Sequence, residues 1–135
     1  MTVAVAFAPR RFFLCFYPSE FDIAMDQLSA EISCSDLKTK LAQEQPLLLL
    51  DCRQQHEHEL ACISGSTLLP MDELVHRQSE IAGLEDRHTV VYCHLGIRSL
   101  QVAAWLREHG FTRVQSLAGG IDAWAVEIDS KMARY

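Results

Sequence analysis

The sequence TVVYCHLGIRS, residues 89–99, combines a strand, a tight turn and the first turn of a helix. Its first four residues are β-branched or aromatic, a composition typical of a central strand. A helix is predicted from Arg98 to His109, where apolar residues recur on one face until Gly110 ends it. Cys93 therefore lies between a buried strand and the start of a helix, with Gly96 midway between the two.

Strands and helices alternate in the same way from Glu31 onward. The stretch from Ser33 to Asp36 has the pattern of a helix start, with a hydroxyl cap followed three residues later by an acid. Such alternation at short spacing predicts an α/β domain with a mainly parallel central sheet. In these sheets ligands bind beyond the carboxyl ends of the strands, which is where Cys93 falls. The patterns predict further helices over Cys34–Ala42, Arg53–Leu60, Met71–Ile81 and Gly120–Glu127, and strands over Leu47–Leu50, Thr67–Leu69 and Arg113–Leu117.

The composition is that of one ordinary globular domain. A chain of 135 residues is long enough for one domain with a core and too short for two. Hydrophobic residues make up 49% of the chain and charged residues 22%, which is typical of a folded, water-soluble protein. The net charge of -6 argues against a nucleic-acid partner, because phosphate binding needs a basic face. No apolar run approaches the roughly 18 residues that would span a membrane.

The five cysteines do not indicate a disulfide framework. Their number is odd and none of them form a CxxC pair. We therefore expect a reducing compartment, the cytoplasm, in which the thiols stay free.

The N-terminal stretch differs from the rest of the chain. Residues 1–27 are expected to be an N-terminal extension or tail and residues 131–135 a C-terminal tail, which leaves 28–130 as the domain. The basic pair of the N-terminal stretch lies in its middle and no small-residue cleavage site follows Tyr17, unlike in a signal peptide. We expect this stretch to be a dispensable tail. The alternatives are an extra edge element of the sheet, or an upstream extension with the working start at Met25.

The turn after Cys93 is suited to stabilising a negative charge. Several amides in a tight turn that leads into a helix can point inward and form an anion-binding nest. Gly96 can adopt the positive φ that such a turn needs. A free thiol has a pKa of about 8.5, and a helix N-terminus can lower that pKa to roughly 3.5–7.5. We therefore predict a thiolate at Cys93, rather than a buried, unreactive cysteine at a strand end.

Three segments, in order, resemble the signatures of the rhodanese-like domain family. Cys93 to Ser99 resembles the active-site loop of that family, and together the three matches cover about residues 31 to 128. Ala61, Cys62 and Ser64 depart from the family's first signature, which we read as local packing variation. The other two segments are Leu50-Asp51-Cys52-Arg53 with Glu57-His58 and Ile63-Ser64-Gly65-Ser66, and Leu117-Ala118-Gly119-Gly120-Ile121-Asp122-Ala123-Trp124.

This resemblance implies a three-layer rhodanese-like domain over residues 28–130 and a sulfurtransferase activity. Cys93 would take the outer sulfur from a donor such as thiosulfate, and the resulting persulfide would pass it to a nucleophilic acceptor such as a thiol or cyanide. Catalysis is expected from Cys93, with the persulfide bound by the residues of its loop, namely His94, Leu95, Gly96, Ile97, Arg98 and Ser99. No metal or organic cofactor is implied, and a protein could serve as sulfur acceptor.

Individual loop side chains allow more than one interpretation. Arg98 could bind an anionic donor at the rim of the loop, or it could pair with a carboxylate. His94 lacks a partner that would orient it as a general base, so a solvated position is expected. Ser99 is expected to cap the helix, although its hydroxyl could instead reach the persulfide.

Several residues outside the loop are expected to be structural. Asp51 and Arg53 should form an ion pair or bind loop backbone, and Arg53 is also spaced to pair with Glu57 across one helical turn. Gly119 and Gly120 should permit a close backbone approach to the active loop.

A metal site is not expected among Cys52, His56, His58 and Cys62. Thiolate and imidazole are zinc ligands, but the spacing of these four matches no established pattern. Cys52 also stands where the family has a buried apolar residue.

Two other functions remain open. Dual-specificity cell-cycle phosphatases share the fold, so a phosphatase or arsenate reductase is one alternative. Their loop places the Arg six residues after the Cys, whereas Arg98 is five after Cys93, which suits a smaller anion. The second alternative is a carrier that holds the persulfide and delivers it to a protein partner.

Overall fold

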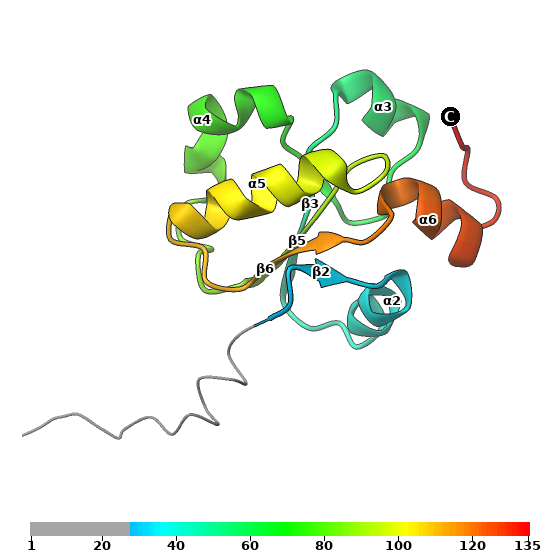
Figure 1. The fold of residues 1–135 in the computed structure, drawn as a ribbon, viewed down its shortest axis with the longest axis horizontal. Coiled ribbons are helices and arrows are strands. Elements are labelled where there is room, and N and C mark those ends of the chain that lie inside the picture. Colours follow the sequence, from blue (N-terminus) through cyan, green and yellow to red (C-terminus); the bar gives the residue numbers. More distant parts are fainter. Residues whose placement is uncertain (1–27) are drawn as a thin grey trace, which may run out of the picture.

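A five-stranded parallel sheet forms the centre of the protein (Figure 1). The computed structural model describes residues 28–135; the predictions made for residues 1–27 lie outside the described part. The sheet order is β2-β6-β5-β3-β4, and every described pair of strands is parallel. The strands are β2 (Glu31–Ile32), β3 (Leu47–Asp51), β4 (Thr67–Leu68), β5 (His88–Tyr92) and β6 (Val114–Leu117).

Helices cover both faces of this sheet, which confirms the predicted three-layer α/β architecture (Figure 1). Helices α4 and α5 pack on one face, and α2 and α6 pack on the other. No helix in residues 28–135 has both the length and the apolar character to cross a bilayer. The helices are α2 (Cys34–Ala42), α3 (Gln55–Leu60), α4 (Leu74–Arg77), α5 (Ile97–Glu108) and α6 (Gly120–Glu127), with 3₁₀ turns at Met71–Glu73 and Gln78–Ile81.

The start of α2 follows from its cap. The Ser33 hydroxyl accepts a hydrogen bond from the amide of Asp36 at 3.1 Å, as the sequence pattern predicts. The predicted bounds of α2 and α6 are both confirmed.

The continuous helix predicted over Met71–Ile81 is wrong. Instead, a 3₁₀ turn, the four-residue helix α4 and a second 3₁₀ turn follow one another. Only Leu74 and Ile81 are buried along this segment. With so few apolar side chains on the core, packing does not enforce one continuous helix, and most helical stability comes from such packing.

Strand β5 is central because both of its faces are covered. All five of its residues are buried, and its neighbours are β3 and β6. Alternate side chains enter different cores: Val91 packs with α5 on one face, and Val90 packs with α2 and α6 on the other. Burying each such side chain is worth about 1.5–3 kcal/mol, so this strand anchors the domain.

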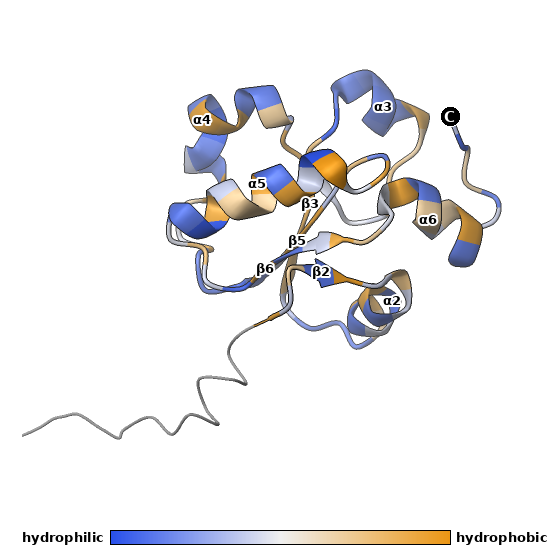
Figure 2. Cartoon of the chain, in the orientation of Figure 1, coloured by the Kyte–Doolittle hydropathy of each residue, from blue (hydrophilic) through white to orange (hydrophobic). Residues whose placement is uncertain are grey.

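The carboxyl ends of β3 and β5 lie side by side. In the parallel register Asp51 is opposite Tyr92, and the amide of Cys52 donates to the carbonyl of Tyr92 at 3.1 Å. The next residues along both strands, Cys52 and Cys93, are therefore neighbours. Figure 2 shows that α3, which follows β3, is hydrophilic, so its position depends on polar contacts rather than on apolar burial.

Candidate active site

The sulfur of Cys93 lies inside the turn that joins β5 to α5. Cys93 Sγ accepts hydrogen bonds from the amides of Gly96, at 3.1 Å, and Ser99, at 3.4 Å. The Ser99 hydroxyl lies 3.3 Å from the same sulfur. Cys93 is only 1% exposed, so water solvates its sulfur little and these donors take the place of water.

The amino end of α6 supports this turn through backbone hydrogen bonds. The amide of Ile121 donates to the carbonyl of Cys93 at 2.8 Å, and the amide of Asp122 donates to that of His94 at 3.1 Å. A Cβ added to Gly120 would lie 2.6 Å from the carbonyl oxygen of Cys93, and closer still to that of His94. The predicted close approach of the double glycine to the loop is confirmed.

Gly96 is required at the bend of the loop itself. It is the N-cap of α5, with a φ of 100°, a region that L-residues rarely occupy. A Cβ here would lie 3.2 Å from the amide nitrogen of Gly119. The left-handed backbone turns the amide of Gly96 toward the sulfur.

These surroundings favour the ionised form of Cys93. The neighbouring thiol of Cys52, as a hydrogen-bond donor, lowers the pKa of Cys93 most; burial opposes this, and Ser99 and the amide of Gly96 add to the lowering. The resulting pKa is about 4. Cys93 is therefore a thiolate at neutral pH, and a thiolate is the nucleophilic form of cysteine.

The expectation that Ser99 caps α5 is wrong. The cap residue is Gly96, and Ser99 is the third residue of the helix, with its side chain facing inward. Its hydroxyl contacts Cys93 Sγ and lies 2.7 Å from the hydroxyl of Ser116 on β6. Both serines are fully buried, so they form a short polar chain that ends on the sulfur.

Arg98 pairs with a carboxylate, the second of the two interpretations that the sequence allowed. Its two terminal nitrogens each donate to one oxygen of Glu57, both at 3.1 Å. This pairing, together with the Gln54 amide, lowers the pKa of Glu57 to about 2 although burial opposes the shift. The ion pair joins the start of α5 to α3, across 41 positions of the sequence.

Asp51 and Arg53 form the structural ion pair that the sequence suggested. Arg53 is fully buried, and its Nε and Nη2 donate to the two carboxylate oxygens of Asp51 at 2.8 and 2.6 Å. Burial raises the pKa of Asp51, but hydrogen bonds from Arg53 and His58 outweigh it and hold that pKa below its usual value. The predicted one-turn pairing of Arg53 with Glu57 is wrong, because α3 begins only at Gln55.

Tyr135 is a neighbour of the loop that the sequence did not reveal. Its ring stacks on that of His94, with centroids 4.0 Å apart. Its hydroxyl donates to Glu57 at 2.9 Å and accepts from Arg53 at 2.8 Å. His94 is therefore covered by an aromatic ring, and not simply solvated as expected. A contact made by a residue so far along the chain leaves no local pattern in the sequence.

The remaining loop side chains face outward. Leu95 is 55% exposed and Ile97 69% exposed, so both surround the site without touching the sulfur. Among the described hydrogen bonds, Cys93 Sγ receives backbone donors from Gly96 and Ser99 and none from the other loop residues.

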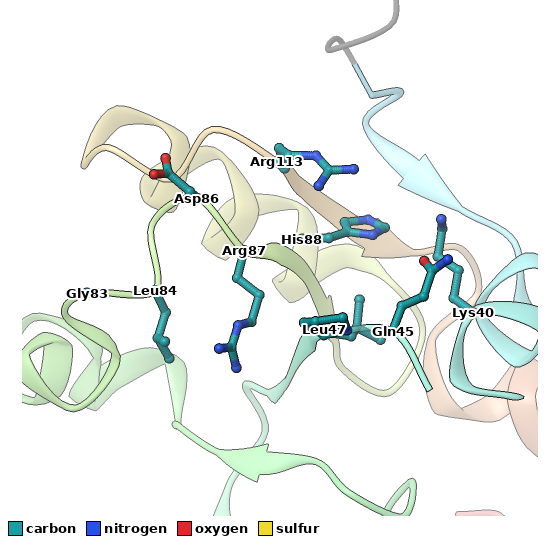
Figure 3. A pocket seen from close by; sticks show the side chains of 10 residues that line it. Lys40, Gln45, Leu47, Gly83, Leu84, Asp86, Arg87, His88 and Arg113 are labelled. Carbon is teal, nitrogen blue, oxygen red and sulfur yellow. The ribbon is translucent and has the colours of Figure 1, made fainter. Parts of the chain in front are cut away.

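A separate hollow of about 650 Å³ lies at the opposite, amino-terminal end of the sheet (Figure 3). Lys40, Arg87 and Arg113 line it, together with the first residues of β3 and β5. It is remote from Cys93, and we assign it no part in the chemistry of the loop.

No cluster of three or more His, Cys, Asp or Glu side chains in residues 28–135 could hold an ion. His58 contacts Asp51 Oδ2 at 2.7 Å and so belongs to the ion-pair network of Arg53.

Comparison with known proteins gives one consistent family. Residues 33–127 match the model of the rhodanese-like domain. A sulfurtransferase of Allochromatium vinosum is 41% identical over 95 residues, which are 70% of this chain and 87% of that protein. A probable adenylyltransferase/sulfurtransferase, MoeZ of Mycobacterium tuberculosis, is 32% identical over 84% of this chain, but the match covers only 29% of MoeZ.

Solved structures agree with the family match. A rhodanese-like domain protein from Staphylococcus aureus superimposes with a TM-score of 0.65 at 26% identity, covering 71% of this chain and 91% of that one. The human single-domain sulfurtransferase TSTD1 superimposes with a TM-score of 0.64 at 27% identity, and the match covers 74% of this chain and 98% of the TSTD1 chain.

Proposed function

The chain belongs to the rhodanese-like domain family, and on that premise we propose that it is a sulfurtransferase that carries sulfane sulfur as a persulfide on Cys93. The observation that carries the proposal is the environment of the Cys93 sulfur. Two backbone amides and a hydroxyl converge on it, and its pKa is about 4. A thiolate of this kind is both a nucleophile and a leaving group, and sulfur exchange needs both properties.

In the first half-reaction the Cys93 thiolate attacks the outer sulfur of a donor such as thiosulfate. The new S–S bond forms as the donor's S–S bond breaks, and the electron pair leaves with sulfite. The product is a Cys93 persulfide anion. The amides of Gly96 and Ser99 would stabilise its charge without any reorganisation of solvent, because they already point into the turn.

In the second half-reaction an acceptor attacks the outer sulfur of the persulfide. With cyanide the products are thiocyanate and the original Cys93 thiolate, so charge and atoms balance over the cycle. The low pKa of Cys93 favours this step too, since the thiolate departs without needing a proton. No step of this cycle requires a metal ion or an organic cofactor.

The phosphatase alternative is less well supported by the same geometry. An oxyanion in the loop needs a free guanidinium beside the cysteine, but both terminal nitrogens of Arg98 are bound to Glu57. The sulfur of Cys93 itself already fills the turn between the amides of Gly96 and Ser99. The short spacing, with Arg98 only five residues after Cys93, also suits a single transferred sulfur atom better than a tetrahedral oxyanion.

A protein acceptor is a second candidate that one observation favours. Exposed apolar side chains surround the buried sulfur, Leu95 and Ile97 from the loop and Leu100 from α5. Exposed apolar groups next to a reactive site are typical of protein-binding surfaces. Efficient loading from a cysteine desulfurase, combined with slow turnover of small donors, would support delivery of sulfur to a protein.

The test is thiocyanate production from thiosulfate and cyanide by the purified full chain. We expect turnover in the wild type and in Cys62→Ser, and none in Cys93→Ser. Aryl phosphates should not be hydrolysed. Phosphate release that disappears in Cys93→Ser, without thiocyanate production in the wild type, would contradict the proposal.

A further inference from the structure

Cys52 is a buried thiol that the proposed sulfur transfer does not use. It follows the last residue of β3, and its amide continues the hydrogen-bond ladder to the carbonyl of Tyr92 at 3.1 Å. Since Asp51 is opposite Tyr92, Cys52 is in register with Cys93 on the neighbouring strand. Both cysteines are only 1% exposed, and both are free thiols.

The two side chains point to the same face of the sheet. Cys52 and Cys93 belong to the same core cluster, together with Leu50, Val91 and residues of α5. Adjacent strands lie about 4.8 Å apart, and the Cα atoms of disulfides are roughly 4.4–6.8 Å apart. Both the spacing and the direction of the side chains therefore permit a direct bond between the two sulfurs.

The two thiols differ in how readily they ionise. The neighbouring Cys93, together with burial, keeps the pKa of Cys52 well above its usual value. The pKa of Cys93 is lowered and that of Cys52 is raised, so the pair favours an ionised Cys93 beside a protonated Cys52. Oxidation of Cys93 to a neutral sulfenic acid would remove the negative charge that keeps the pKa of Cys52 high. Cys52 would then ionise more easily, and an ionised thiol can attack the oxidised sulfur of Cys93.

The other described cysteines are worse placed to reach Cys93. Cys34 lies at the start of α2 and packs in the core on the opposite face of the sheet, where its thiol faces the carbonyl of Ala118 at 3.9 Å. Cys62 is half-buried and lines a hollow beside Trp124 and Ile128.

We propose that Cys52 is a resolving cysteine, which forms a reversible disulfide with Cys93 when a peroxide oxidises the active site. The proposal goes beyond sulfur transfer and depends on neither the donor nor the acceptor. The bond closes the site to sulfur donors and protects Cys93 from irreversible oxidation.

The chemistry has two balanced steps. The Cys93 thiolate attacks one oxygen of hydrogen peroxide; the O–O bond breaks, hydroxide leaves and takes up a proton, and Cys93 becomes a sulfenic acid. The Cys52 sulfur then attacks the sulfur of that acid, the S–O bond breaks, and water leaves with the proton of Cys52. Peroxide is the oxidant, the two cysteines supply the two electrons, and an external dithiol reverses the change.

The sequence allows the crosslink to be identified without ambiguity. Trypsin cleaves after Lys40 and Arg53, and after Arg87 and Arg98, so Cys52 and Cys93 each fall alone in a peptide. Peroxide treatment of the full chain, alkylation of the remaining thiols and peptide mass spectrometry should give residues 41–53 joined to residues 88–98. Dithiothreitol should then separate the pair and restore alkylation of Cys93.

The variant Cys52→Val keeps an apolar side chain at the position and removes the resolving sulfur. It should convert severalfold more of its oxidised Cys93 to sulfinic and sulfonic acid, which dithiothreitol does not reverse. The measurement compares how oxidised Cys93 divides between disulfide, sulfinic acid and sulfonic acid. The oxidation rate is not compared, because loss of Cys52 also changes the ionisation of Cys93. Cys62→Ser is the matched control and should give the same crosslink as the wild type.

Two results would overturn the proposal. In the first, the wild type gives no joined peptides, and the fraction of its Cys93 oxidised to sulfinic acid is the same as in Cys52→Val. The second is a disulfide from Cys93 to a different cysteine. The wild-type peptide map shows whether Cys52 and Cys93 are crosslinked, even if a variant fails to fold.

Discussion

The amide of Ile121 donates a hydrogen bond to the carbonyl oxygen of Cys93 at 2.8 Å, so the start of α6 supports the loop at its reactive residue. The amide of Asp122 supports the next carbonyl in the same way. With both carbonyls turned toward α6, the amides farther along the loop point the other way, toward the sulfur. The glycine pair before Ile121 thus shapes a site to which it contributes no side chain.

Substituting Gly120 by Ala should disrupt the loop. The new Cβ would lie 2.6 Å from the carbonyl oxygen of Cys93, a clash with backbone that cannot move aside cheaply. We expect a loss of stability on the order of 2 kcal/mol beyond the strain of a positive φ, and at least about a tenfold loss of sulfur transfer. Urea unfolding and thiocyanate production measure the two effects.

The control is Gly83→Ala, because Gly83 also has a positive φ but no atom within 4 Å of an added Cβ. It should show the backbone strain alone and keep its activity. Equal loss in the two variants would mean that close packing of Gly120 against the loop does not shape the site.

The ionisation of Cys93 can be measured through its alkylation by iodoacetamide. A pKa of about 4 means that the rate should rise through that pH and then stay level from about pH 5.5 to pH 8. In Cys52→Val the rise should move to higher pH, because the neighbouring thiol is the largest cause of the low pKa. A wild-type rate that climbs through about pH 8.5, as for a free thiol, would show that the loop does not stabilise the thiolate.

The ion pair of Glu57 and Arg98 should make the protein sensitive to acid. Folding lowers the pKa of Glu57 from 4.5 to about 2, so the charged carboxylate stabilises the fold above pH 4.5. That contribution falls as the pH drops from 4.5 toward 2. Glu57→Gln should lose about 1–3 kcal/mol at neutral pH and show a flatter decline over the acid range.

Urea unfolding at several pH values compares Glu57→Gln with the wild type. Glu59→Gln serves as control, since Glu59 is an exposed residue of the same helix. If the wild type and Glu57→Gln differ by a constant amount at every pH, the pairing with Arg98 does not produce the acid dependence.

Local patterns in the sequence predicted much of the fold. The cap at Ser33, the buried run of β3 and the strand–turn–helix around Cys93 each depend on residues close together in the chain. The two-residue edge strand β2 was not predicted, because two residues are too few for a pattern of alternation.

The candidate site was harder to predict where residues far apart in the chain meet. The pairing of Arg98 with Glu57, and the stacking of Tyr135 on His94, depend on how the folded elements are placed. Capping was preferred for Ser99 over a contact with the sulfur for a related reason: only the backbone at Gly96 fixes where α5 begins, and thus which way the hydroxyl points. Cys52 could have been singled out from the sequence, since it follows one buried strand as Cys93 follows another.

The central claim is that Cys93 carries the transferred sulfur. Intact-mass analysis of the full chain after exposure to thiosulfate tests it most directly. The account predicts a gain of one sulfur atom, found in the tryptic peptide of residues 88–98 and removed by cyanide, and no gain in Cys93→Ala. An unchanged mass in the wild type, or the same gain in Cys93→Ala, would contradict it.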